Sequence, residues 1–342
     1  MASRAFITGL SGATVTPDER EFLRQTQPWG LILFKRNINS PHQAYSLIDE
    51  FRNAVGFRAP VLIDQEGGRV QRLGPPQWPV YPPGAVYGRL YAKDAAAGLA
   101  AARLGARLIA QDLNRLGIDV DCLPLADVPT ATADPVIGDR AYGTTPEQVA
   151  AIAGAIAEGL LAGGVLPVLK HLPGHGRAAA DSHLRLPVVD TARVDLEATD
   201  FAAFRPLNRL PMGMTAHVVF SAIDPVAPAT TSATIVSQVI RDGIGFEGLL
   251  MSDDVSMGAL SGTLGERSRA ALAAGCDVVL HCNGRLDEMQ EVAAAVPPLS
   301  GAALRRAEAA LAVRREPEPL DVDAARRAFE AMIAGERGAM IA

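Results

Sequence analysis

The sequence has few cysteines, few aromatic residues and no excess of positive charge, and each shortage excludes a class of protein. Its three cysteines, Cys122, Cys276 and Cys282, form neither a disulfide framework nor a CxxC metal pair, as expected for a reduced, cytosolic protein. Aromatic residues make up only 5% of the chain while alanine and glycine are abundant, which favours closely packed helices over an aromatic-rich sandwich. The net charge of −6, with both signs interspersed, indicates neither nucleic acid nor an anionic membrane as a partner.

Long hydrophobic runs are also missing. The first ten residues contain one arginine and reach Gly9 almost at once, which is too little for the apolar region of a secretory signal peptide. No stretch approaches the ~20 apolar residues of a membrane-spanning helix. We therefore expect a cytoplasmic protein that associates with neither membrane nor nucleic acid.

Apolar residues nevertheless make up 49% of the chain, which is enough for a large core. Eight short, mostly aliphatic runs recur along it, and segments of helical spacing lie between them, most clearly Ala95–Leu116 and Pro146–Ala162. Several runs do not alternate with polar residues, as expected for strands buried on both faces. The runs are Ala5–Thr8, Gly30–Phe34, Pro60–Ile63, Ile118–Cys122, Val165–Leu169, Met212–Ala216, Gly248–Met251 and Asp277–Leu280.

The alternation of strands and helices implies parallel pairing, and eight strands fit a closed (β/α)8 TIM-like barrel. An open doubly wound sheet is the main alternative, but Gly9–Gly12, after the first strand, does not match the phosphate-binding pattern G-x-G-x-x-G. We expect residues 1–342 to form a single catalytic barrel domain, with C-terminal helices in residues 300–342 packing on the barrel.

Polar and ionisable residues collect where five of the eight predicted strands end. In barrels, this C-terminal face is where active sites are built, so we expect these residues to share one site. They are Asp64-Gln65-Glu66, Lys170-His171, His217, Ser252-Asp253-Asp254 and His281.

Half of the six histidines lie in one short region, the run Lys170–Gly176 followed by Asp181-Ser182-His183. Histidine carries protons near neutral pH, and the Asp181 carboxylate can fix the tautomer of His183. Lys170 and His171 can donate hydrogen bonds to substrate hydroxyls.

The same histidines suggest a metal site as an alternative. Its ligands would be His171, His175, Asp181 and His183, but Pro173 and Gly174 interrupt any helix that could present the first two. We expect no metal and no cofactor.

Three further groups of residues are open to either a structural or a functional interpretation. Asp253 and Asp254 end a buried strand, where they either cap a following helix or face a site, and alternation along the strand leaves open which one faces it. Asp64 and Arg72 either bind sugar hydroxyls or form an internal salt bridge. Arg140 lies in a loop bounded by turn residues, and by itself it would be an ordinary surface arginine.

Four motifs occur in order: Val61–Arg72, Lys170–Gly176, Asp181–His183 and Met251–Met257. Together they resemble the bacterial β-N-acetylhexosaminidases of glycoside hydrolase family 3, the peptidoglycan-recycling enzymes. The similarity extends roughly from residue 30 to residue 283. This resemblance implies a (β/α)8 barrel, which agrees with the strand count.

The resemblance also implies roles for the candidate residues. It identifies Asp253 as the nucleophile of a retaining hydrolase and His183, assisted by Asp181, as the acid/base. The sugar-binding positions that it implies are Asp64, Arg72, Arg140, Lys170 and His171. The implied substrates are N-acetylglucosaminyl anhydro-muropeptides.

The chain departs from the family at Leu172, Asp134 and Tyr142, where relatives often have Phe, Asn and Phe. The charge of Asp134 is expected to weaken the hold of Arg140 on substrate. A family 3 β-glucosidase is a competing interpretation, although many of these add a second large domain for which a chain ending at Ala342 is expected to have no room. A non-catalytic sugar-binding barrel and a metallohydrolase also compete with the hexosaminidase interpretation.

Overall fold

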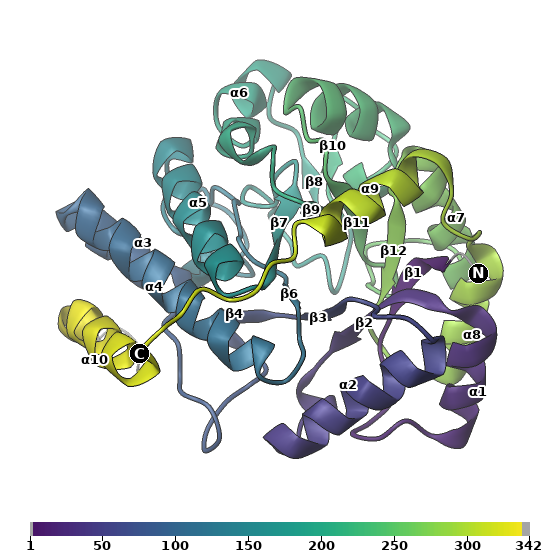
Figure 1. Ribbon diagram of the computed structural model, residues 1–342. Helices are drawn as coiled ribbons and strands as arrows, with labels where there is room; N and C mark the ends of the chain where they lie inside the picture. Colours follow the sequence, from purple (N-terminus) through teal and green to yellow (C-terminus); the bar gives the residue numbers. More distant parts are fainter. Residues whose placement is uncertain (1–2, 337–342) are drawn as a thin grey trace.

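The computed structural model describes residues 3–336, and its centre is a closed barrel of parallel strands in the order β1-β12-β11-β9-β7-β6-β3-β2 (Figure 1). Each of the eight predicted apolar runs overlaps one of these strands, so the predicted (β/α)8 barrel is confirmed. The strands are β1 (Arg4–Thr8), β2 (Pro28–Leu33), β3 (Val61–Ile63), β6 (Val120–Asp121), β7 (Leu166–Leu172), β9 (Met212–Thr215), β11 (Leu249–Asp254) and β12 (Val278–His281).

Helices surround the barrel (Figure 1). The α-helices are α1 (Pro17–Thr26), α2 (Pro41–Val55), α3 (Gly84–Lys93), α4 (Ala95–Asn114), α5 (Pro146–Ala162), α6 (Arg193–Ala198), α7 (Leu264–Ala274), α8 (Leu286–Ala295), α9 (Gly301–Ala312) and α10 (Val322–Ile333). Short 3-10 turns are η1 (Lys35–Asn37), η2 (Gly138–Arg140), η3 (Phe201–Ala203), η4 (Arg205–Leu207) and η5 (Ala229–Thr231), and η6 (Ile235–Gly243) is a π-helix.

Capping side chains explain where several helices begin. Thr16 and Glu19 form a reciprocal capping box at the start of α1, and Pro17 occupies its first turn. Asp94 caps α4 by accepting from two backbone amides, and Thr145 caps α5. The predicted helix over Pro146–Ala162 therefore has the observed bounds of α5, and the predicted Ala95–Leu116 ends at Asn114 instead.

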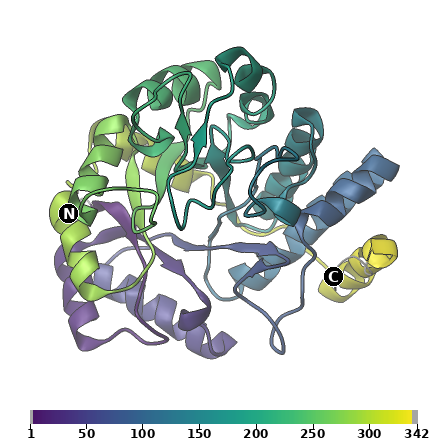
Figure 2. The same ribbon diagram turned by 180° about the vertical axis from the view of Figure 1, so that it is seen from behind.

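The barrel strands are buried on both faces, which explains why their sequences are apolar runs without alternation. One core cluster contains residues from all eight barrel strands, among them Ile7, Val168 and Met251, together with Ala307 and Ala310 of α9. This cluster fills the barrel interior, and α9 crosses one end of the barrel (Figure 1). The chain packs α10 against α4 at the side. The loops that follow the strands lie at the other end of the barrel (Figure 2).

Two small sheets lie outside the barrel. Strands β4 (Gln65–Gly67) and β5 (Val70–Gln71) form an antiparallel hairpin, and β8 (Val188–Val189) pairs with β10 (Val219–Phe220) in parallel. The hairpin turn contains Gly68 at φ +55°, a left-handed conformation that favours glycine. Its Cβ would also lie 2.7 Å from Pro83 Cβ, so only glycine fits there. This hairpin begins directly after β3 and extends over the end of the barrel that carries the cavity.

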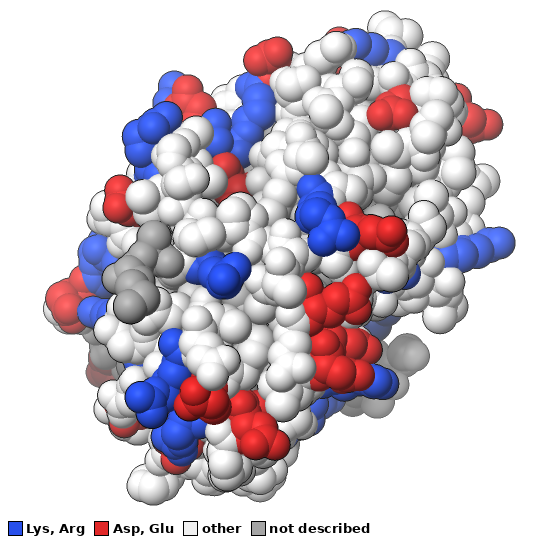
Figure 3. Space-filling view, turned by 90° about the vertical axis from the view of Figure 1, so that its right-hand side faces the viewer, with Lys and Arg blue, Asp and Glu red and all other residues white. Residues whose placement is uncertain are grey.

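Two details concern the ends of the chain and its surface. Part of the predicted C-terminal segment, residues 337–342, lies outside the described residues. Within residues 3–336, no helix is both long enough and apolar enough to cross a membrane. On the face shown in Figure 3, a group of acidic side chains has basic side chains beside it, and most of the surface is uncharged.

Candidate active site

A cavity of about 420 Å³ opens at the carboxyl end of the barrel. Ile32, Met214 and Leu280, from three barrel strands, form part of its lining. Of the strand-end residues expected to share one site, Gln65, His217, Ser252 and His281 do not line this cavity. All eight residues to which the family resemblance gives a role do line it. These residues are Asp64, Arg72, Arg140, Lys170, His171, Asp181, His183 and Asp253.

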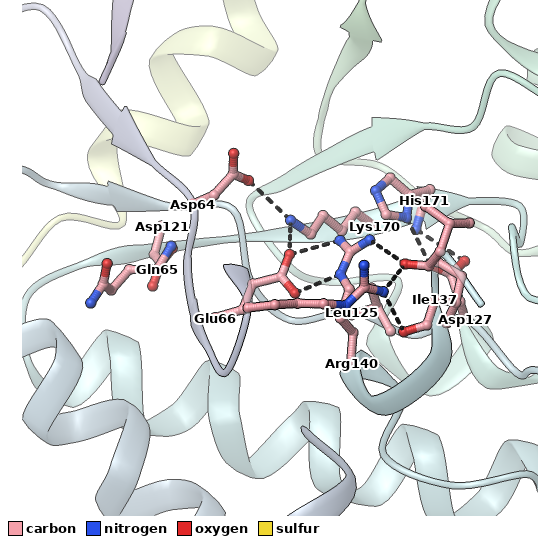
Figure 4. A network of polar contacts seen from close by, with 12 residues as sticks. Asp64, Gln65, Glu66, Asp121, Leu125, Asp127, Ile137, Arg140, Lys170 and His171 are labelled. Atoms are coloured by element: carbon pink, nitrogen blue, oxygen red, sulfur yellow. Dashed lines mark hydrogen bonds and ion pairs between the residues drawn. The ribbon is translucent and has the colours of Figure 1, made fainter. Parts of the chain in front are cut away.

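Lys170 lies at the centre of a buried charged network (Figure 4). It projects from β7, and its Nζ lies 3.1 Å from Asp64 Oδ1 and 2.6 Å from Glu66 Oε1. Burial alone would lower the pKa of this ammonium, but Glu66 and Asp64 outweigh burial and raise it. Lys170 is therefore a permanent cation that two carboxylates hold in place.

Glu66 is a member of this network to which the sequence interpretation gave no role. Arg140 donates to both of its oxygens, from Nε at 2.9 Å and from Nη2 at 2.8 Å. Burial would raise the pKa of Glu66, but Arg140 and Lys170 hold it far below the ordinary value. Glu66 thus joins the 138–140 turn to β7, and Arg140 is a buried ion-pair partner rather than a surface arginine.

Asp64 and Arg72 form the ion pair that the sequence left open, with Arg72 Nη2 3.0 Å from Asp64 Oδ2. Both also line the cavity, so the two interpretations are compatible. Asp134 and Arg140 have different partners in the described structure, and the expected weakening of substrate binding stays a prediction. Asp134 accepts a hydrogen bond from Val136 N at 2.9 Å, while the guanidinium of Arg140 pairs with Glu66. We refer to Asp64, Glu66, Arg72, Arg140 and Lys170 as the charged cluster.

His171 is oriented by Asp127, a fully buried carboxylate that sequence reasoning missed. His171 Nδ1 lies 2.7 Å from Asp127 Oδ2. Burial would raise the pKa of Asp127, but His171 lowers it, and an ionised carboxylate only accepts. The hydrogen in this contact is therefore on Nδ1, which leaves Nε2 as the ring nitrogen that can contact a ligand.

Asp253 and Asp254 belong to strand β11, so the helix-cap interpretation is wrong. The next helix, α7, begins at Leu264 and is capped by Thr263. Asp254 is engaged by Ser256, from N at 3.0 Å and Oγ at 2.6 Å, and by Cys282 N at 3.2 Å. Asp254 therefore holds the chain that follows the strand.

Asp253 has fewer contacts than Asp254. One of its oxygens accepts from Asp254 N at 2.8 Å. Burial would raise its pKa, but His217 and His171 lower it, so Asp253 is ionised at neutral pH. His217 is fully buried and lies between two polar groups, 2.7 Å from Thr230 Oγ1 and 3.0 Å from the carbonyl oxygen of Asp254. His217 thus fixes the backbone beside Asp253.

Asp181 and His183 form a pair on the loop after β7, which we call the loop dyad. Asp181 Oδ1 accepts from both the backbone N of His183, at 2.9 Å, and its ring Nδ1, at 2.7 Å. Burial would slightly raise the pKa of Asp181, but these hydrogen bonds lower it. The hydrogen on Nδ1 is therefore fixed, and Nε2 is the atom that can accept or release a proton.

His175, between β7 and the loop dyad, is buried and does not share the role of His183. Its backbone N donates to Asp127 Oδ1 at 2.6 Å, and its Nε2 lies 3.0 Å from Ser182 Oγ. Burial and the nearby His171 lower its pKa to about 4, so the ring is neutral at physiological pH. Within residues 3–336, no group of three or more His, Cys, Asp or Glu side chains is arranged to hold a metal ion.

The cavity therefore combines the weakly engaged, ionised carboxylate of Asp253, the imidazoles of His171 and His183, whose tautomers are fixed by carboxylates, and a cluster of fixed charges. Comparison with known proteins defines the class first. Residues 7–315 match the glycosyl hydrolase family 3 N-terminal domain, and the chain belongs to this family of glycoside hydrolases.

The similar proteins define a narrower group. A β-hexosaminidase of Alkalilimnicola ehrlichii is 42% identical over 281 residues, covering 80% of this chain and 79% of that protein. A β-hexosaminidase of Methylococcus capsulatus is 41% identical over 280 residues, covering 80% and 81%. Among solved structures, NagZ from Neisseria gonorrhoeae in complex with N-trifluoroacetyl-D-glucosamine matches with a TM-score of 0.84 and 32% identity, covering 99% of this chain and 98% of that one.

Proposed function

We propose that the protein is a retaining β-N-acetylhexosaminidase that releases terminal β-linked N-acetylglucosamine. The observation that carries the proposal is the presence of an ionised, weakly engaged Asp253 and the Asp181-held imidazole of His183 in one cavity. A nucleophilic carboxylate and a separate proton carrier are the two groups that a retaining glycosidase needs.

The reaction has two steps. In the first, Asp253 attacks the anomeric carbon while Nε2 of protonated His183 gives its proton to the departing glycosidic oxygen, which leaves a glycosyl ester on Asp253. In the second, neutral His183 takes a proton from water as the water attacks the same carbon. Asp253 leaves as a carboxylate, and the sugar regains its β configuration.

The electrostatics of the site are consistent with a histidine, rather than a carboxylate, as the acid/base. An ionised carboxylate acting as the acid/base beside Asp253 would repel the anionic nucleophile, whereas a neutral imidazole does not. Asp181 supplies the negative charge that stabilises the imidazolium, and it does so from the far side of the ring, at Nδ1.

The charged cluster and His171 are proposed to bind the sugar ring. Asp64 can accept hydrogen bonds from sugar hydroxyls, while Arg72, Arg140 and Lys170 can donate to them. Their mutual ion pairs hold these groups in place before substrate arrives, which reduces the entropy lost on binding.

We extend the proposal to the substrate class and the compartment. The family resemblance supports N-acetylglucosaminyl anhydro-muropeptides, fragments of peptidoglycan, as substrates in a cytoplasmic recycling route. The NagZ structure with bound N-trifluoroacetyl-D-glucosamine supports an N-acylated glucosamine as the sugar. Release of N-acetylglucosamine from purified muropeptides, together with cell fractionation, tests this extension.

The central test compares variants on a chromogenic aryl β-N-acetylglucosaminide. The parent is expected to hydrolyse it faster than the matching β-glucoside, and Asp253→Ala is expected to lower kcat by about 10³-fold or more. His183→Ala should lower kcat by about 10²-fold or more. Ser237→Ala, on the exposed side of η6, is the control and should keep the parental rate.

Three outcomes would contradict the proposal. Folded Asp253→Ala and His183→Ala variants with the parental rate would show that other groups carry the reaction. A preference for the β-glucoside would favour another β-glycosidase activity. Binding of N-acetylglucosamine without any turnover would favour a sugar-binding barrel.

A further inference from the structure

We infer that Ser182 is a positioning residue, which holds the loop dyad over the cavity through its contact with His175. This inference rests on the proposed function, because it concerns how His183 is placed for proton transfer. Ser182 lies between Asp181 and His183 in the sequence but differs from both in exposure. It is 3% exposed, whereas the side chains of Asp181 and His183 are 30% and 65% exposed.

The Ser182 hydroxyl is the side-chain hydrogen-bonding group that ties residues 181–184 to the rest of the described chain. Its Oγ lies 3.0 Å from His175 Nε2. The other hydrogen bonds from outside this segment are donated by backbone amides. Arg185 N, next along the chain, donates to Asp181 O at 3.1 Å, and Gly258 N to His183 O and Ala259 N to Ser182 O, each at 3.2 Å. The dyad's own side-chain hydrogen bond, between Asp181 and His183, is internal and does not set the position of the pair.

His175 is a firm anchor for this contact because it is fixed at its backbone and its ring. Its amide donates to Asp127 Oδ1 at 2.6 Å, the carboxylate that also orients His171. Its ring packs edge-on against the His171 ring, with centroids 5.7 Å apart. The next residue must be Gly176, since a Cβ there would lie 2.1 Å from the carbonyl oxygen of Val128. His175 therefore positions the dyad relative to the ring of His171, which lines the proposed sugar site.

Loss of the Ser182 hydroxyl should change the position of the loop dyad and not its proton-transfer chemistry. Without the hydroxyl, Asp181 and His183 keep their own hydrogen bond, but the pair can move as a unit relative to Asp253. Because proton transfer requires the donor within hydrogen-bond distance of the oxygen, a displacement of about 1 Å can lower the rate of that step by up to about 10²-fold. Binding of the sugar ring by the charged cluster is unaffected.

The test uses two aryl β-N-acetylglucosaminides that differ in how much protonation the leaving group needs. For Ser182→Ala, kcat/KM on a phenyl-type substrate with a poor leaving group should fall about tenfold. On a dinitrophenyl-type substrate, which leaves without protonation, kcat/KM should stay within about twofold of the parent. A general structural defect would lower both values equally. Equal losses on the two substrates, or no loss on the poor one, would overturn the inference.

A double-mutant cycle isolates the contact itself. His175→Leu should show the same leaving-group dependence, and the double variant with Ser182→Ala should lose no more than the worse single variant. Losses that multiply would mean that the two residues act separately, which would contradict the contact. If His175→Leu does not fold, hydrogen exchange replaces the cycle: amides 181–184 should exchange faster in Ser182→Ala than in Ser237→Ala, and unchanged exchange would count against the inference.

The proposed function and this inference fail in different ways. If the parent does not hydrolyse either substrate, or if His183→Ala keeps full activity on the poor leaving group, the proposed function is wrong. If His183→Ala is impaired on the poor leaving group and Ser182→Ala is not, only the positioning role of Ser182 is wrong.

Discussion

The Lys170 side chain is 2% exposed and contacts two carboxylates, whereas the His183 side chain is 65% exposed and hydrogen-bonds to one. Both residues line the same cavity, yet one belongs to a barrel strand and the other to a loop. The charged cluster is fixed by ion pairs among buried and half-buried groups, and most of these pairs join residues that are distant in the sequence. The loop dyad is a local pair, which the Ser182 hydroxyl and the backbone amides of Gly258 and Ala259 tie to the rest of the described protein. We interpret this difference as a division between binding, which needs fixed charges, and proton transfer, which needs access to the leaving group and to water.

The largest expected effect is the loss of stability on removing the charge of Glu66, the carboxylate that joins Lys170 and Arg140 in the charged cluster. Glu66→Gln leaves the buried cations Lys170 and Arg140 without their shared partner, so the free energy of unfolding should fall by about 3–5 kcal/mol. Chemical denaturation of the parent and the variant measures this. The matched control is Glu247→Gln, which breaks the exposed Arg209–Glu247 pair and should cost less than about 1 kcal/mol. Equal losses in the two variants would show that the cluster is not a structural unit.

The corresponding change in the loop dyad should affect rate and not stability. Asp181→Asn removes the charge beside the imidazole, so kcat should fall by about tenfold to a hundredfold, less than for His183→Ala. Because the pair is exposed, the free energy of unfolding should change by less than about 1 kcal/mol. Steady-state kinetics and denaturation of the same preparations measure both quantities. A large loss of stability with unchanged kcat would reverse the roles that we assign to the two regions.

The ion pairs of Glu66 also predict a smaller change, in the pH dependence of the free energy of unfolding. Burial raises the pKa of Glu66, but Arg140 and Lys170 overcome this and hold it below 4.5, its ordinary value. A depressed carboxyl pKa stabilises the fold fully above the unfolded value, and this stabilisation is lost as the pH falls through the folded value. The stability difference between parent and Glu66→Gln should therefore shrink by about 1–2 kcal/mol between pH 7 and pH 3. A difference that stays constant or grows in acid would contradict the ion-pair account, and the Glu247→Gln control should show little change.

The barrel could be predicted from the sequence because each buried parallel strand corresponds to a short apolar run. The end of one strand was harder to predict. After β6 the chain continues beside β7, since Val168 N donates to the carbonyl oxygen of Leu123 and Lys170 N to that of Pro124. The prediction ended this strand at Cys122 and therefore missed Asp127, which is carried to the side of His171 by the continued pairing. An acidic residue that closes the apolar run Cys122–Ala126 was the available signal.

The members of the site could be predicted where motifs marked them, but their partners could not. The end of a predicted strand placed Glu66 near the site, but its role could not be predicted, because it comes from Arg140 and Lys170, which are distant in the sequence. The same holds for Ser182, whose contact with His175 depends on the path of the loop between them. Alternation along the strand left the choice between Asp253 and Asp254 open, and only the resemblance implied Asp253. The structure agrees with that choice, because Asp254 is bound to Ser256 and Cys282 while Asp253 is weakly engaged.

The most direct test of the central claim traps the covalent intermediate. A 5-fluoro derivative of N-acetylglucosaminyl fluoride should react with the enzyme to form a glycosyl-enzyme that is hydrolysed slowly. Digestion and tandem mass spectrometry then locate the added sugar. The account predicts a single glycosyl ester on Asp253 and a β-configured first product by NMR. An ester on Asp254 or another residue, or an inverted product with no covalent adduct, would contradict it.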